Sequence, residues 1–167
     1  MGKATFSAST MTPQEIPGSW KLFTDGGCRV NPGGLGGWGA VLIPPNSDTP
    51  RARLSGVDPT TTNNRMEMMA LINGLREVPA GESVTIFTDS QYLIWAVQDW
   101  PVASRKSKEK AKNKDLLEQI SNCLDRLGTS RCVWVKGHSG DRWNEECDKL
   151  ANREMDLWES RFADGYP

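Results

Sequence analysis

The chain has 167 residues and a formal net charge of −1, and hydrophobic and charged residues make up 37% and 25% of it. This length favours one domain with a substantial core, and the absence of any uncharged apolar stretch of about 18 residues excludes a membrane span. Four cysteines without a C-x-x-C pair indicate reduced thiols, and the first residues lack a signal-peptide core, so we expect a cytoplasmic protein.

The first predicted strand, Trp20–Asp25, ends in a phrase that the chain repeats. Leu22–Gly27 and Ile86–Gln91 share one pattern: an apolar residue, then Phe, Thr and Asp, and then small or polar residues. Because side chains alternate faces along a strand, Asp25 and Asp89 would project from the same end and side of two adjacent parallel strands. Such a pair of charges requires a cation or a shared proton, although each Asp alone is equally well explained as a turn residue.

A glycine-rich link, Gly26–Gly37, follows the first strand. Two further strands are predicted at Trp38–Ile43 and Arg51–Val57, separated by a Pro-Pro-Asn-Ser turn, so an antiparallel meander opens the domain. The Thr/Asn cluster Thr60–Asn64 then offers caps for the start of a helix.

The helix after this cluster carries an apolar stripe at i, i+3, i+4, i+7 spacing, formed by Met68, Leu71, Ile72 and Leu75. Glu67 shares a face with Ala70, Leu71 and Gly74, so we expect it to point inward, where a carboxylate needs a partner. The alternative is an exposed Glu that the helix dipole favours near the N-terminus.

The second half of the chain alternates strands and helices, which gives the predicted order β-β-β-α-β-α-α-β-α. The remaining elements are a strand at Val84–Thr88, a helix from Ser90 to a break at Trp100, a helix over Leu116–Leu127, a strand at Arg131–Val135 and a helix over Trp143–Met155. Asp148 lies in the first half of that last helix.

Two segments between these elements are candidates for binding or catalysis. Arg105–Lys114 contains six basic residues and one acid, a local charge of 6 − 1 = +5, which is typical of phosphate binding but also of a solvated face. Lys136–Asp141 is a polar loop that holds His138, the chain's only histidine, and a lone loop histidine is often ordinary surface.

Five phrases, in this order, resemble type 1 ribonuclease H: Thr24–Cys28, Thr62–Glu67, Thr88–Tyr92, Val135–Gly140 and Asn144–Asp148. The resemblance covers roughly residues 20–151. It implies an α/β protein with the ribonuclease H-like fold, in which helices flank a five-stranded mixed sheet of three antiparallel strands followed by parallel strands. We expect a flexible tail at 1–18, a catalytic domain at 19–155 and an extension at 156–167.

The resemblance implies an endonuclease that hydrolyses the RNA strand of RNA–DNA hybrids, acting as a monomer. It assigns four carboxylates as metal ligands, Asp25, Glu67, Asp89 and Asp148, and it places His138 in proton transfer or product departure. Four carboxylates can hold two hard cations about 3.5–4 Å apart, so we expect two Mg²⁺ ions, for which Mn²⁺ can substitute.

The same resemblance predicts the residues that contact the hybrid: Cys28, Asn31, Thr62, Asn63, Asn64, Gln91, Trp100, Arg105 and Lys106. Amide side chains both donate and accept hydrogen bonds, which suits the 2′-hydroxyl of RNA. Thr62 matches a DNA-phosphate contact and Trp100 a contact with DNA sugars. The basic block matches the hybrid-gripping handle of bacterial forms but lacks the tryptophans expected there.

Two other functions fit this pattern less well. A catalytically silent hybrid-binding module would lack one of the acids, and none is missing. A transposase or integrase also gathers acids on strands but lacks the amide set of Asn63, Asn64 and Gln91. Cleavage tests on DNA duplex, RNA duplex and hybrid would separate these functions.

Overall fold

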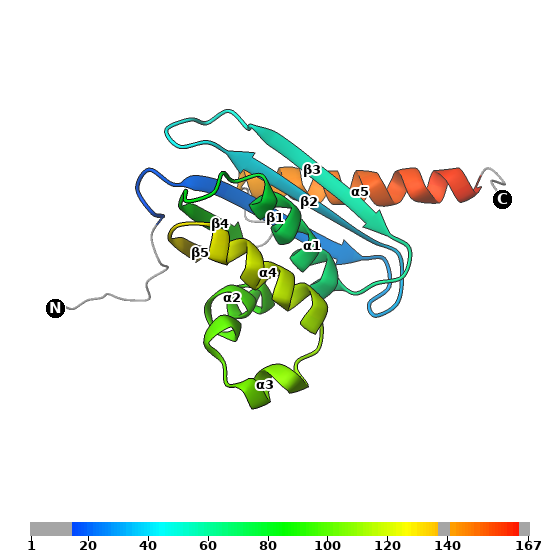
Figure 1. The fold of residues 1–167 in the computed structure, drawn as a ribbon. Coiled ribbons are helices and arrows are strands. Elements are labelled where there is room, and N and C mark those ends of the chain that lie inside the picture. Colours follow the sequence, from blue (N-terminus) through cyan, green and yellow to red (C-terminus); the bar gives the residue numbers. More distant parts are fainter. Residues whose placement is uncertain (1–14, 137–140, 164–167) are drawn as a thin grey trace.

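The computed structural model describes residues 15–136 and 141–163, which form one five-stranded sheet with helices on both faces (Figure 1). The strands are β1 (Trp20–Cys28), β2 (Gly36–Ile43), β3 (Ala52–Asp58), β4 (Val84–Thr88) and β5 (Ser130–Trp134), in the spatial order β3-β2-β1-β4-β5. The pairs β1–β2 and β2–β3 are antiparallel, whereas β1–β4 and β4–β5 are parallel. The predicted mixed sheet is therefore confirmed.

The helices divide between the two faces of this sheet. One face is covered by α1 (Asn63–Arg76), α2 (Gln91–Gln98) and α4 (Lys114–Arg126), and the other is crossed by α5 (Arg142–Ala163) (Figure 1). The larger apolar core lies on the first face, and a smaller one containing Phe23, Val41 and Cys147 lies under α5. Among the described helices, none is long and apolar enough to cross a bilayer.

The glycine-rich link is shorter than predicted. β1 continues to Cys28 and β2 begins at Gly36, because Gly26 pairs with Trp38 and Cys28 pairs with Gly36 in the antiparallel ladder. Glycine weakens strands in general, so its presence indicated a loop where backbone pairing in fact keeps the chain extended.

The basic block and the last helix also differ from the predicted elements. The structure forms a 3-10 turn, η1 (Trp100–Val102), and a short helix, α3 (Arg105–Lys110), where no element was predicted. The hydroxyl of Ser104 accepts a hydrogen bond from Ser107 N and so caps α3. α5 runs to Ala163 without a break, so it crosses the predicted boundary after residue 155. The division into tail, domain and extension stays a prediction.

Candidate active site at the ends of the central strands

The repeated phrase brings two aspartates together. β1 and β4 are adjacent and parallel, and their register pairs Phe23 with Phe87, each two residues before an aspartate. The two phenyl rings stack with centroids 4.5 Å apart and planes 10° from parallel. Asp25 and Asp89 therefore project at the same end of neighbouring strands, as the matched phase predicted.

Glu67 reaches this position because α1 lies very close to β1. Thr62 caps the helix by accepting a hydrogen bond from Arg65 N at 3.2 Å. A Cβ added to Gly26 would lie 2.5 Å from the carbonyl carbon of Met66 and 2.6 Å from Glu67 N, so only glycine allows this approach. Glu67 is buried, with 8% of its surface exposed, which confirms the inward orientation.

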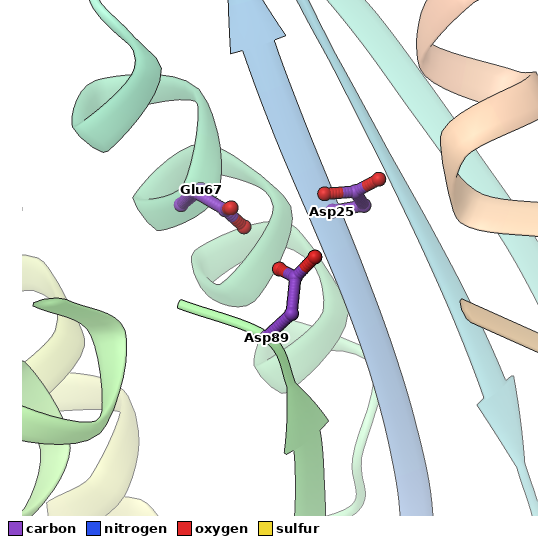
Figure 2. Close-up of side chains that lie close together, drawn as sticks. All are labelled: Asp25, Glu67 and Asp89. Atoms are coloured by element: carbon purple, nitrogen blue, oxygen red, sulfur yellow. The ribbon is translucent and has the colours of Figure 1, made fainter. Parts of the chain in front are cut away.

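Three carboxylates converge from three different elements (Figure 2). Asp25 on β1, Glu67 on α1 and Asp89 just after β4 each offer an oxygen, and these oxygens lie within 4.8 Å of one another. Oε1 of Glu67 is buried and has no hydrogen-bond partner among the described residues. A buried carboxylate oxygen without a donor is costly unless a cation approaches it, so this oxygen-only donor set fits a hard divalent ion.

The fourth predicted acid approaches from the other face of the sheet. Asp148 lies on α5 and lines a pocket of about 230 Å³ together with Asp25 and Asp89. It does not belong to the group of three whose oxygens lie within 4.8 Å. The structure therefore places three acids in one tight cluster, and the fourth beside Asp25.

The electrostatics of the pocket follow from this crowding. Burial, and then the charges of Asp89 and Asp148, raise the pKa of Asp25 to about 7, against an ordinary 3.8. Burial raises the pKa of Glu67 well above its usual range, and the charges of Asp25 and Asp89 add to this effect. Like charges held in a buried site favour the uptake of protons or of a cation.

This pKa shift predicts how stability depends on pH without divalent ions. The pKa of Asp25 is higher in the folded chain, so the folded state binds more protons between pH 4 and 7, and the free energy of unfolding falls as pH rises through that window. We expect Asp25→Asn to remove about 1–3 kcal/mol of this fall. Urea unfolding of wild type and Asp25→Asn in EDTA, at pH 4.5 and 7.5, measures this decrease in the free energy of unfolding. An identical decrease in the two proteins would contradict the raised pKa of Asp25.

The predicted hybrid contacts near the pocket form a connected group. Cys28 N donates to Asn63 Oδ1 at 2.7 Å, and Asn63 N donates to Asn31 Oδ1 at 2.9 Å. A second hollow is lined by Asn31, Thr62, Asn63 and Asn64 with Lys112 and Asn113. The structure thus gathers polar residues of the β1–β2 link and the start of α1 along one groove beside the carboxylates.

The other predicted contacts are more dispersed. Gln91 is exposed at the first residue of α2, and Arg105 and Lys106 are exposed on α3, which lies apart from the sheet (Figure 1). Trp100 is 4% exposed and packs into the main core beneath Lys108, whose Nζ lies 4.9 Å from the ring centroid. This burial leaves little of the ring for the predicted sugar contact. His138 lies outside the described residues.

Sequence reasoning missed two residues at this site. Asn152 and Arg29 also line the acidic pocket, and Asn152 Nδ2 donates to Asp148 Oδ1 at 3.2 Å. Asn152 follows Asp148 by four positions, and residues at that spacing face each other on a helix, so the pair was detectable in principle. Arg29 has no comparable local signal, because its partners lie on α5, more than 120 residues away.

The fold and the acidic site together define an α/β protein of the ribonuclease H-like class. Two solved structures share this fold with TM-scores of 0.66. One is the N-terminal RNase H domain of a Mycobacterium tuberculosis protein, 25% identical, with 83% of this chain and 94% of that chain covered. The other is LC11-RNase H1 in complex with RNA/DNA hybrid, 24% identical, with coverage of 83% and 98%.

Sequence comparison identifies the family. The family model described as RNase H matches residues 17–156. Ribonuclease H of Pseudomonas fluorescens is 41% identical over 144 residues, covering 83% of this chain and 93% of the relative. The chain therefore belongs to the ribonuclease H family, and the resemblance to its type 1 members is confirmed.

Proposed function

We propose that the protein is an endoribonuclease that hydrolyses the RNA strand of RNA–DNA hybrids with the help of two divalent ions. The observation that carries this proposal is the convergence of Asp25, Glu67 and Asp89, whose oxygens lie within 4.8 Å of one another. Membership of the ribonuclease H family supports the reaction type. The hybrid bound to LC11-RNase H1 supports the substrate class.

The oxygen-only donor set supports the proposed metal ligands. Asp25, Glu67 and Asp89 would hold one ion, and Asp148 with Asp25 a second, with Mg²⁺ as the expected ion and Mn²⁺ as a substitute. When bound, such ions activate a water for in-line attack and stabilise the leaving oxygen. The chain itself leaves Oε1 of Glu67 buried without a hydrogen-bond donor among the described residues, so this oxygen is available to a cation. His138 is proposed to assist proton transfer or product departure.

The groove beside the pocket would bind the hybrid. Its amides, Asn31, Asn63 and Asn64, can accept from and donate to a 2′-hydroxyl, which distinguishes the RNA strand from DNA. Arg105 and Lys106 on α3 would add phosphate contacts that weaken as salt rises. We expect the protein to act in the cytoplasm as a monomer.

A cleavage panel tests the proposal. Labelled DNA duplex, RNA duplex and RNA–DNA hybrid are incubated with the protein in Mg²⁺, in Mn²⁺ and in excess EDTA. We expect internal cuts in the RNA strand of the hybrid alone, and none in EDTA. Equal cutting of duplex DNA would indicate a transposase-like nuclease, whereas hybrid binding without cleavage in either metal would indicate a silent binding module.

A further inference from the structure

Asn152 lies between the Asp148 carboxylate of the proposed site and the guanidinium of Arg29, which follows β1. Its Nδ2 donates to Asp148 Oδ1 at 3.2 Å and to the main-chain oxygen of Asp148 at 2.9 Å. Its Oδ1 accepts from Nη1 of Arg29 at 3.3 Å. Both ends of this amide are thus engaged, one by an acceptor and the other by a donor.

Arg29 helps to determine which end of the Asn152 amide faces the carboxylate. A guanidinium has only donors, so it selects the amide oxygen and directs the NH₂ group of Asn152 toward Asp148. The main-chain oxygen of Asp148 favours the same orientation, because it accepts from the NH₂ group. Loss of Arg29 would remove the donor that holds the amide oxygen, and would leave Asn152 with its contacts to Asp148 alone.

Arg29 is itself held by the last turns of α5. Its Nη2 donates to Asp156 Oδ1 at 2.5 Å, and its Nε and Nη2 both donate to Glu159 Oε1, at 3.2 and 3.0 Å. The Arg29 side chain is 33% exposed despite these contacts. Both acids lie beyond Met155, in the segment that sequence reasoning left without a role, and they tie this part of α5 to the β1–β2 link.

Asp148 is the proposed ligand for which such support matters most. Asp25, Glu67 and Asp89 are brought together by the β1–β4 register and by the contact between Gly26 and α1. Asp148 approaches alone from α5 and stands outside that tight cluster. The rotamer of its side chain decides whether its oxygens can share a cation with Asp25.

We propose that Asn152 is a positioning residue that holds the Asp148 carboxylate in its metal-binding orientation. Arg29, which is hydrogen-bonded to Asp156 and Glu159, keeps Asn152 in place. The proposal rests on the proposed function, because it deepens the role of Asp148 in that site. Hydrogen-bond partners of metal ligands typically affect metal affinity by about 10–100-fold. The C-terminal turns of α5 thereby act on metal binding from outside the pocket.

Mn²⁺ binding to Asn152→Ala provides the direct test. Calorimetric titration of the hybrid-free protein should show overall Mn²⁺ affinity reduced by about 10-fold, and the Mg²⁺ concentration for half-maximal cleavage should rise by a similar factor. Excess metal should restore most of kcat, with KM for hybrid unchanged. Asn73→Ala is the matched control, because Asn73 Nδ2 also donates to a main-chain oxygen four residues earlier, Met69 O at 2.8 Å, but has no hydrogen bond to a carboxylate within the described part of the chain.

A double-mutant cycle separates positioning from a general structural effect. Arg29→Ala should also reduce the affinity for Mn²⁺. The double variant, Arg29→Ala with Asn152→Ala, should bind Mn²⁺ no more weakly than Asn152→Ala alone, since all of these variants break the same chain of contacts. Fully additive losses, or Mn²⁺ binding by Asn152→Ala equal to that of wild type, would overturn the proposal. Failure of wild type to cleave hybrid would refute the proposed function, while the calorimetric result would still decide the role of Asn152.

Discussion

Asp25→Asn is expected to lower kcat for Mg²⁺-dependent cleavage of an RNA–DNA hybrid by at least about 10³-fold. Asp25 lies in the cluster with Glu67 and Asp89, and the charge of Asp148 also acts on it, so we propose it as the ligand that two cations would share. Asparagine keeps the size of the side chain but removes the charge and one of the two oxygens. The substitution would therefore weaken the binding of both ions.

Hybrid affinity should change far less than turnover in this variant. The proposed contacts run along the amide groove and α3, so binding measured by fluorescence anisotropy in Ca²⁺ should stay within about threefold of wild type. Asp125→Asn makes the same isosteric change on the exposed face of α4 and should leave both quantities unaltered. Turnover by Asp25→Asn within tenfold of wild type would remove Asp25 from the metal site.

The carboxylate cluster was largely predictable because its signals are local. The phrase that ends in Asp25 is repeated in phase at Asp89, and strand alternation then determines which side each acid occupies. The inward orientation of Glu67 follows from helical periodicity alone. Adjacent pairing of β1 with β4 was the remaining assumption, and the stacked Phe23 and Phe87 rings show how their side chains stabilise that register.

The residues that could not be predicted are those whose partners are distant in sequence. Arg29 meets Asp156 and Glu159 only after the whole sheet has formed, so no window of sequence contains that contact. Trp100 was assigned to the substrate by resemblance, but burial beneath Lys108 depends on the path of η1 and α3. Such contacts depend on tertiary packing and produce no helical or strand periodicity that the sequence could reveal.

The glycines of the first two strands also make contacts that the sequence alone could not predict. Sequence reasoning placed Gly26 and Gly37 in a link, because glycine disfavours strands. In the structure both are contact points in the sheet: a Cβ on Gly37 would lie 2.5 Å from Ala151 O on α5, and one on Gly26 would meet α1. The absence of a side chain at these positions therefore brings Glu67 and Asp148 close to Asp25.

Gly26→Ala should accordingly damage both stability and catalysis. The added methyl would lie 2.5 Å from the Met66 carbonyl carbon and 2.6 Å from Glu67 N, and both are main-chain atoms that cannot rotate away. We expect a loss of about 1–3 kcal/mol in the free energy of unfolding, as for other overpacked contacts. Displacement of Glu67 by about 1 Å should lower cleavage by about 10²-fold.

Gly27→Ala isolates the packing effect in Gly26→Ala from the general effect of adding a methyl group to β1. At Gly27, among the described residues, the new Cβ would have one neighbour within 4 Å, Asn63 Oδ1 at 3.7 Å, which is ordinary van der Waals contact. Both substitutions reduce unfolded-state entropy and improve strand propensity alike, so the difference between them in urea unfolding reports the contact with α1. If Gly26→Ala proves as stable as Gly27→Ala, α1 does not press on β1 here, and another constraint must hold Glu67 beside Asp25.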